Sequence, residues 1–487
     1  MKKFQTVEGC VVQAYRFALD PTPSQARALA SHAGAARCAY NWAIGRIRAN
    51  WDQRDAEASY GLTGEDLTPW QGWSLPALRR DWNTVKDTAA PWWAQNSKEA
   101  YGTGLANAAA AMKNWNESRK GVRKGKKVGF PRFKKKHKAA QACRFTTGSI
   151  RLEPDRRHVT LPRLGTVRTH ESTRKLERRL AAGRARILSA TVRRESCGRW
   201  FCSFQVEVQR AVATSARPRA AVGVDLGVKV LAVLADSDGQ VRYVPNPKHL
   251  DAALAGLRRA NRVLARRQGP AVIDPATGRR CGYRAPSTGW QQARTDLGRA
   301  HARVRHLRAD GLHKLTTSIA AEYGTVVVED LNVAGMLRNH KLARRIADAG
   351  FGEIRRQLTY KTRWNGGVLV VANRWYPSSK TCSGCGTVKA KLSLGVRVFA
   401  CESCGLAIDR DENAARNLAD LALAVQGGTG VAGDPDAQAS KARGADQRTR
   451  NRSEPARIGR AGGVILPHQR QKETGHRHQD TEALTLW

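Results

Sequence analysis

The spacing of hydrophobic and polar residues divides the first part of the chain into a strand and a helical segment. Residues 11–20 alternate as a β-strand does, and the alternation stops at Pro21. Residues 24–51 repeat at helical spacing, with Ser24 as the expected cap, and more helical sequence runs from about 75 to 118. We therefore predict one strand followed by a helical domain.

Short strands dominate between residues 140 and 215. They are expected at 142–145, 149–152, 158–161, 190–194 and 200–208, and the residues Ser196 to Gly198 supply a hairpin turn between the last two. Together with the first strand they predict a small β-domain, 1–20 and 126–216. The helical domain, 21–125, is then an insertion into it.

After residue 219 the pattern is three strands, a helix, a strand, a helix, a strand and a last helix. This is the element order of a ribonuclease-H-like domain, so the expected fold class is multidomain α/β. The strands are expected at 221–225, 229–235, 240–244, 325–329 and 367–372, and the helices at 248–268, from 290 to 323, at 351–364 and from Asp411. Residues 269–289 are interpreted as a loop insertion, and residues 425–487, with little apolar content, as a disordered tail.

The charge balance indicates a polyanionic partner. The 84 Lys and Arg residues outnumber 41 Asp and Glu, giving a formal net charge of +43. Such a chain repels itself, which favours a nucleic acid as the normal partner. No amphipathic basic helix stands apart, so membrane-surface binding is the weaker interpretation.

The basic residues are densest between Lys113 and Lys138, where twelve Lys and Arg face one acid, Glu117. Phe130 and Phe133 lie within this run, so phosphate contacts could be combined with packing on bases or sugars. A solvated linker is the alternative. No apolar run of signal-peptide or membrane-spanning length occurs, and we expect a soluble cytoplasmic protein associated with the nucleoid.

Four of the ten cysteines have the spacing of metal ligands. They are Cys382, Cys385, Cys401 and Cys404. Two Cys-x2-Cys pairs fifteen residues apart, each followed by glycine, are typical of a tetrahedral structural zinc site. A pair of disulfides is less favoured in a cytoplasmic chain. The other six cysteines are interpreted as buried or incidental thiols.

Three acidic residues carry the candidate chemistry. Asp225 and Glu329 each lie at the end of a β-branched run, and Asp411 lies where the last helix begins. If the strands are neighbours, three carboxylates converge and require compensating charge, which hard divalent cations such as Mg²⁺ supply. Asp330 is expected on the opposite face from Glu329, and Asp409 is expected to cap the helix. The pattern indicates metal-assisted phosphodiester chemistry.

Several segments also carry a family resemblance: Gly223–Gly227, Val328–Asn332, Trp375–Cys382, the four-cysteine segment and Asp409–Leu418, with Tyr15–Phe17 and Gly129–Lys134 nearer the N-terminus. With these residues the chain resembles the TnpB family, insertion-sequence proteins long called OrfB transposases and related to type V CRISPR effectors. The resemblance covers about residues 11–423.

The resemblance implies a β-barrel-like wedge domain with an inserted helical recognition domain, followed by a RuvC nuclease domain. The RuvC domain would comprise residues 217–380 and 406–424, interrupted by a zinc ribbon at 381–405 that contacts the target nucleic acid. The family's catalytic carboxylates match Asp225, Glu329 and Asp411. The implied activity is Mg²⁺-dependent cleavage of double-stranded DNA, directed by a guide RNA transcribed from the transposable element.

Two other functions stay open at this point. Three carboxylates with metal ions could also serve a strand-transfer transposase, because transesterification needs the same groups. A non-catalytic regulator could use the zinc ribbon and the basic surface alone. Intact acids at all three positions argue against the regulator.

Overall fold

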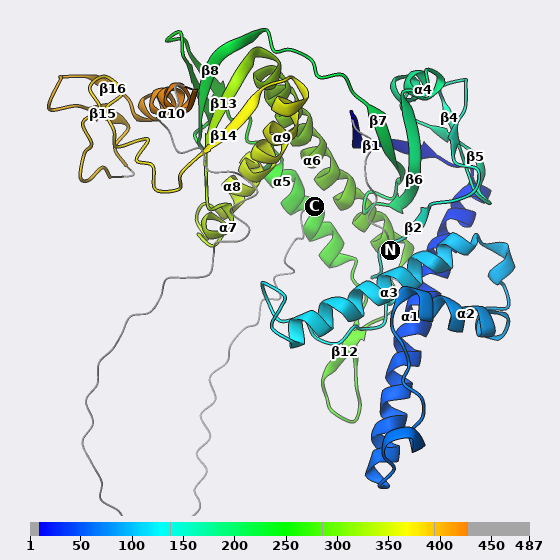
Figure 1. Ribbon diagram of the computed structural model, residues 1–487. Coiled ribbons are helices and arrows are strands. Elements are labelled where there is room, and N and C mark those ends of the chain that lie inside the picture. The colour runs from blue at the N-terminus through cyan, green and yellow to red at the C-terminus, as the bar shows by residue number, and fades with distance from the viewer. Residues whose placement is uncertain (1–8, 137, 285, 394, 427–487) are drawn as a thin grey trace, which may run out of the picture. The chain divides into compact units, whose positions relative to one another are not determined.

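The computed structural model describes residues 9–426, apart from residues 137, 285 and 394 (Figure 1). Two large sheets and helices make up a mixed α/β fold, so the predicted class is confirmed at this level. The last helix, α10 (Arg410–Gln426), includes the first two residues of the predicted tail. The rest of that tail lies outside the described residues.

A seven-stranded antiparallel sheet is built from the N-terminal strand and the segment after residue 140. Its members are β1 (Cys10–Asp20), β2 (Ala142–Phe145), β3 (Arg151–Leu152), β4 (His158–Leu161), β5 (Gly165–Thr169), β6 (Ala185–Arg194) and β7 (Trp200–Gln209). Their order is β2-β6-β7-β1-β5-β4-β3. β1 pairs with β7 from Cys10 opposite Gln209 to Leu19 opposite Trp200.

Two elements of this region were not predicted. β5 has only five residues and buries two of them, Val167 and Thr169, which is too little for a clear alternation. The helix α4 (Arg174–Ala181) has a single buried residue, Leu176, which is too little for a clear helical pattern.

The helical segment begins with α1 (Pro23–Ser59), whose cap is Thr22 and not Ser24. The Thr22 hydroxyl accepts a hydrogen bond from the Gln25 N–H, and the Gln25 side chain accepts one from the Thr22 N–H. This reciprocal pair satisfies two backbone donors, while Pro23 has none to satisfy. The predicted helical stretch 75–118 is two helices, α2 (Leu75–Ala89) and α3 (Lys98–Arg119), separated around Pro91.

A five-stranded sheet forms the second half of the described chain. It contains β8 (Arg217–Leu226), β9 (Val230–Asp236), β10 (Val241–Pro245), β13 (Tyr323–Glu329) and β14 (Val368–Ala372), in the order β10-β9-β8-β13-β14. β13 is parallel to both β8 and β14, whereas β9 is antiparallel to its neighbours. The carboxyl ends of β8, β13 and β14 therefore meet at one edge.

The two faces of this sheet are covered by different helices (Figure 1). The helices α5 (His249–Arg266), α6 (Thr288–Glu322), α8 (Ala343–Ala349) and α9 (Phe351–Trp364) lie on one side, with the short α7 (Val333–Met336) near them. Their core includes Val222, Val224, Val326 and Val328. α10 covers the other side, where Leu418 packs with Ala221 and Val327.

The insertion at 269–289 is not a plain loop. It contains a hairpin of β11 (Ala271–Ile273) and β12 (Arg280–Tyr283). The Asp274 side chain accepts hydrogen bonds from the Ala276 N–H and the Thr277 hydroxyl, which closes the turn. A second short hairpin, β15 (Val398–Ala400) with β16 (Ala407–Asp409), belongs to the cysteine-rich segment. Among the described residues, no helix is long and apolar enough to cross a membrane.

Candidate active site at the edge of the five-stranded sheet

Asp225 and Glu329 lie side by side at the ends of two parallel strands. Val224 of β8 is opposite Val328 of β13, so the residue that follows each is an acid at the same level. Both carboxylates are half-buried and share the strand face that α10 covers, because Ala221 and Val327 on that face pack against α10. The strand register alone brings these two side chains together.

Asp411 is added by the close approach of α10 to β8. A side chain at Gly223 would place its Cβ only 2.0 Å from the carbonyl oxygen of Ala415 and 2.5 Å from the backbone nitrogen of Ala419. Glycine is therefore required for the helix to lie this near the strand. Asp411 occupies the first turn of α10, one turn before Ala415, and so reaches the sheet edge that carries Asp225.

The three predicted acids influence one another electrostatically. The pKa of Asp225 is raised well above its ordinary value, first by burial and then by the negative charges of Glu329 and Asp411. Arg410 offsets part of this effect, and Arg397 lies 3.9 Å from Asp411. A carboxyl group with two like charges beside it favours the binding of a cation, which would offset the repulsion among the three.

Asp330 has partners on the opposite side of the sheet from α10, and Asp409 caps α10, as predicted, although its charge also contributes to the raised pKa of Asp225. Asp330 accepts hydrogen bonds from Arg355 and Arg374. Asp409 accepts hydrogen bonds from the backbone N–H groups of Asp411 and Glu412 at 2.9 and 3.2 Å, which caps α10. Each of these two acids therefore has hydrogen-bond donors that hold its carboxylate.

Ser378 and two asparagines are part of the site and were given no role from the sequence. The buried Ser378 hydroxyl donates a hydrogen bond to Glu329 Oε1 at 2.5 Å. Asn417 donates to the Ser378 carbonyl at 2.7 Å, and Asn413 donates to the Thr381 carbonyl at 2.6 Å. In the sequence, the spacing of four residues between the two asparagines could have indicated that both lie on one face of a helix and contact the same segment.

The four predicted cysteines do come together. Their sulfur atoms all lie within 4.8 Å of one another, and the Cys382–Cys404 and Cys385–Cys401 pairs are 3.6 Å apart. A disulfide would need about 2.05 Å. Four sulfurs at about 2.3 Å from one tetrahedral metal ion would stand roughly 3.8 Å apart. The arrangement thus fits a metal ion and not two disulfides.

Both Cys-x2-Cys pairs use the same turn. Gly386 and Gly405, which follow the pairs, have φ of 77° and 76°, a conformation that favours glycine. Their N–H groups donate to the carbonyls of Cys382 and Cys401. Hydrogen bonding with Thr387 lowers the pKa of the Cys385 thiol to about 6, whereas hydrogen bonds to the thiols of Cys385 and Cys382 raise the pKa of Cys404.

The carboxylate site is more open than the cysteine cluster. Within the described residues, the four cysteines are the one group of three or more potential metal ligands whose ligand atoms all lie within 4.8 Å of one another. The carboxylates repel and stay further apart, but their donor set consists only of oxygen atoms at a half-buried rim. Such a donor set suits Mg²⁺, which retains several waters and binds through few carboxylates.

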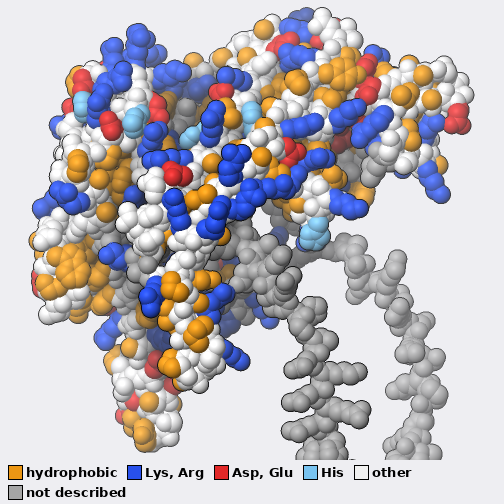
Figure 2. Space-filling view, turned by 180° about the vertical axis from the view of Figure 1, so that it is seen from behind, with side chains coloured by type: hydrophobic (Ala, Val, Ile, Leu, Met, Phe, Trp, Pro, Cys, Tyr) orange, Lys and Arg blue, Asp and Glu red, His pale blue; other side chains and the backbone are white. Residues whose placement is uncertain are grey.

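Basic side chains spread over the surface, with fewer acidic ones between them on the face seen in Figure 2. The basic residues of the segment Lys113–Lys138 differ in how far they are exposed to solvent. Lys134 is half-buried with its Nζ 3.8 Å from the Tyr40 ring centroid, and burial lowers its pKa. Phe130 packs against Trp51 and is not free to contact a base.

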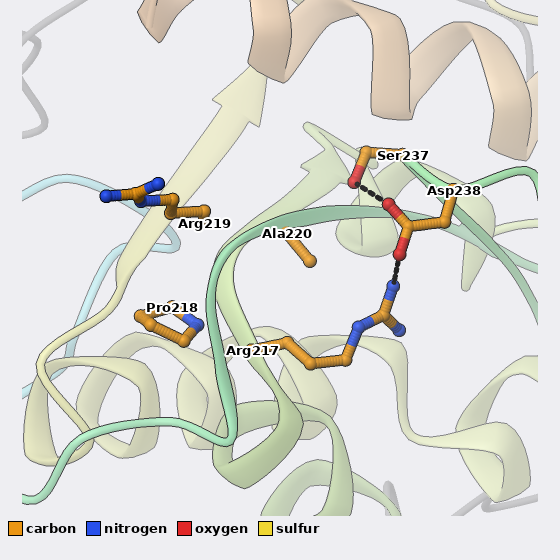
Figure 3. A pocket seen from close by; sticks show the side chains of 6 residues that line it. All are labelled: Arg217, Pro218, Arg219, Ala220, Ser237 and Asp238. Carbon is orange, nitrogen blue, oxygen red and sulfur yellow. Dashed lines mark hydrogen bonds and ion pairs between the residues drawn. The ribbon is translucent and has the colours of Figure 1, made fainter.

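A hollow of about 340 Å³ lies at the opposite end of β8 from Asp225 (Figure 3). Arg217 lines it, but its guanidinium is already paired with Asp236 and Asp238. These acids raise the pKa of Arg217 and offset its charge. Arg219 also lines the hollow, but the one acid that lines it, Asp238, is paired with Arg217, so the hollow offers no group of carboxylates and the candidate site remains the carboxylate edge.

Comparison with known proteins gives the family. Three family models match the chain: "Probable transposase" at residues 203–340, "Cas12f1-like, TNB domain" at 351–418 and "Helix-turn-helix domain" at 11–56. The "Putative RNA-guided DNA endonuclease Rv2885c" of Mycobacterium tuberculosis (strain ATCC 25618 / H37Rv) is 45% identical over 86% of this chain and 88% of its own. The chain belongs to the TnpB family.

Other relatives cover a similar share of this TnpB-family chain. A Streptomyces pristinaespiralis protein with the same description is 34% identical over 85% of this chain and 90% of its own. InsQ of Escherichia coli (strain K12) is 28% identical over 84% and 91%. The solved Cas12f1-sgRNA-target DNA complex aligns with a TM-score of 0.46 and 12% identity, covering 85% of this chain and 99% of that chain.

Proposed function

We propose that this protein is an RNA-guided DNA endonuclease encoded by a transposable element, with Asp225, Glu329 and Asp411 as the catalytic carboxylates of a RuvC-like site. The observation that carries the proposal is the meeting of these three acids at one sheet edge, where burial and then the charges of Glu329 and Asp411 raise the pKa of Asp225. The relatives' description as RNA-guided DNA endonucleases supports the choice of substrate.

The three carboxylates would hold Mg²⁺. Bound there, Mg²⁺ would activate the attacking water and stabilise the departing 3′ oxygen. Asp225 offers a carboxylate that needs a cation to stay ionised, while Ser378 orients Glu329 through its hydrogen bond. α10 sets the position of Asp411, and Asp409 holds the first turn of that helix.

The partners would be a guide RNA and a target double-stranded DNA. A net charge of +43 supplies phosphate contacts for both, and sequence recognition would come from base pairing with the RNA. The domain limits given by the resemblance, including a wedge-type domain and a helical recognition domain, belong to the same proposal.

Cys382, Cys385, Cys401 and Cys404 would hold one structural zinc ion. Four thiolates leave no position for water, so the ion would stabilise the ribbon. The hydrogen bonds of Asn413 and Asn417 to the segment before and around Cys382 would transmit that order to α10 and hence to Asp411.

The test is cleavage of a target duplex by protein loaded with its RNA, in Mg²⁺ buffer. The RNA that co-purifies with the protein is first sequenced to define the guide and the target. Wild type should cut the matched duplex and leave an unmatched one intact. Glu329→Gln should abolish cutting and keep RNA binding.

Each result bears on a specific alternative. Joined DNA products in place of cut ends would support a strand-transfer transposase. Cutting that ignores the RNA sequence would contradict RNA guidance. Binding without any cutting, in wild type and Glu329→Gln alike, would support a non-catalytic regulator and contradict the nuclease proposal.

A further inference from the structure

Trp375 is the most exposed tryptophan of the described residues, with 85% of its surface accessible. It lies in the turn that follows β14, three residues before Ser378. Tryptophan is usually well buried because its large apolar ring is costly to leave in water. Among the described residues, this indole has no apolar cover, so it is available to a ligand bound at the candidate active site.

The backbone around Trp375 is held firmly although its side chain is free. The Trp375 N–H donates to Asn373 Oδ1 at 2.9 Å, and the Tyr376 N–H donates to the Asn373 carbonyl at 2.9 Å. Tyr376 is anchored further by its hydroxyl, which donates to the Asn417 carbonyl at 3.0 Å. A fixed backbone reduces the entropy lost when the indole is immobilised by a ligand.

Trp375 is close to the carboxylates. Three residues span at most about 10 Å, and Ser378 itself contacts Glu329. Stacked bases of one strand follow one another at about 3.4 Å. The indole is therefore within a few nucleotides of any phosphate held at the carboxylate edge.

The chemistry of the surroundings suits a nucleotide. Arg374 precedes Trp375 and shares the Asp330 carboxylate with Arg355, so the two guanidinium groups and one acid keep a net positive charge. Basic groups that contact phosphates beside an aromatic ring that stacks on bases are the means by which proteins hold single strands without reading their sequence. In a duplex, neighbouring bases already cover both faces of each base.

We propose that Trp375 stacks on an unpaired base of the DNA strand that enters the carboxylate site, and so positions the scissile phosphate. This inference rests on the proposed function, because it assumes that the carboxylate edge receives DNA. It adds a substrate-binding residue to the site and requires the strand to be unpaired there.

The first measurement is single-turnover cleavage by RNA-loaded protein. Trp375→Ala and Trp375→Leu should slow cutting by roughly 5- to 150-fold, the range that the loss of one base–aromatic stack gives. Trp375→Phe should restore most of the rate, because it keeps an aromatic face. Tyr283→Ala is the matched control, since Tyr283 is an exposed aromatic residue on β12 and should leave the rate unchanged.

The second measurement detects stacking directly. 2-Aminopurine is placed at each base near the mapped cut, and its fluorescence is read in complexes of Asp225→Asn protein, which should not cut. Stacking on the indole should quench one or two positions, and Trp375→Ala in the same background should restore their fluorescence. A fluorescence pattern that ignores Trp375, or full cutting by Trp375→Ala, would overturn the inference.

The design separates this inference from the proposed function. If wild type cuts no DNA, the nuclease proposal fails by itself. The stacking inference is then decided with a single-stranded oligonucleotide bound to the RNA-loaded wild-type protein, carrying 2-aminopurine at successive positions. Quenching that Trp375→Ala abolishes would support it, and quenching that persists would overturn it.

Discussion

At the scale of single residues, neighbours decide which acids can serve as metal ligands. Asp225 lies beside two other carboxylates and has a raised pKa. Asp330, the residue after Glu329, is paired with two arginines. Although burial alone would raise the pKa of Asp330, the hydrogen bonds from Arg355 and Arg374 lower it. The two aspartates should therefore respond oppositely to loss of charge.

Asp225→Asn should abolish cutting and stabilise the Mg²⁺-free protein. Because the folded-state pKa of Asp225 is raised, the folded chain binds more protons than the unfolded chain, whose aspartate pKa is about 3.9. In buffer without Mg²⁺ and without chelator, wild-type stability should thus fall as pH rises from about 4 through the raised pKa, and the asparagine variant should lose less stability. At pH 7.5 we expect its Tm about 2 °C or more above wild type, and cleavage at least about 100-fold slower.

Asp330→Asn is the matched control, for which we expect the opposite change in stability. Its lowered pKa means that the ionised carboxylate stabilises the fold above the unfolded-state pKa, and that this stability is lost as pH falls through the lower folded-state value. The variant should melt below wild type at neutral pH and keep cutting within about tenfold. An Asp225→Asn protein that melts lower than wild type in buffer without Mg²⁺ and without chelator would contradict this account.

At the scale of elements, the site depends on how closely α10 lies against β8 and on how the cysteine ribbon is tied to α10. Gly223 permits the close packing of α10 against β8, since any Cβ at this position would clash with the backbone of α10. The cysteine ribbon is tied to α10 by Asn413 and Asn417, which hydrogen-bond to the segment that leads into Cys382. Both features lie away from the reacting groups but determine where Asp411 is held.

Gly223→Ala should displace α10. We expect a loss of about 1–3 kcal/mol in the free energy of unfolding from overpacking, and a large loss of cleavage because Asp411 moves with the helix. Gly256→Ala is the control: Gly256 lies within α5 with open space around it, and alanine there should stabilise the protein by about 0.4–1 kcal/mol. Urea unfolding and cleavage rates measure both effects. Equal behaviour of the two variants would refute the packing argument.

The cysteine ribbon should contain one zinc ion per chain. Cys382→Ser should remove it, measured by elemental analysis of protein prepared without chelator, because Cys382 is a buried member of the cluster. Cleavage should fall more than nucleic-acid binding does, since the ribbon supports α10. Cys281→Ser, an exposed thiol on β12, should keep the metal. Zinc-free wild-type protein would exclude the site.

At the scale of the whole molecule, the high positive charge acts through side chains that solvent can reach. In the densest basic segment, Lys135 and Lys136 are exposed, whereas Lys134 packs over Tyr40. Counterion release depends on cations that contact phosphate, so the three adjacent lysines should differ.

Replacing Lys135 and Lys136 together by Ala should weaken nucleic-acid binding and reduce the slope of log affinity against log salt by roughly 1 to 2. Lys134→Ala should leave the slope nearly unchanged and lower the thermal stability instead, because it removes a cation–π contact. Binding measured over a series of KCl concentrations distinguishes the two. A slope reduced as much by Lys134→Ala as by the double change would contradict the burial argument.

Local patterns in the sequence were enough to predict most elements and the cysteine cluster. β-branched runs that end in an acid predict strands with Asp225 and Glu329 at their ends, and Cys-x2-Cys-Gly predicts a metal-binding turn, because these features depend on residues a few positions apart. Short or weakly patterned elements such as β5, and the hairpin at 271–283, were missed because they bury few side chains.

The tertiary structure decided what is distant in the chain. The register of β8 against β13 puts Asp225 level with Glu329, and packing at Gly223 brings in Asp411. Ser378 is part of the site because it hydrogen-bonds to Glu329. Lys134 is half-buried because it packs over Tyr40 of α1. The sequence by itself determined most of the elements and identified the acids and cysteines that have chemistry to offer. Their convergence required folding, because side-chain packing sets the distances between strands and helices that no local pattern encodes.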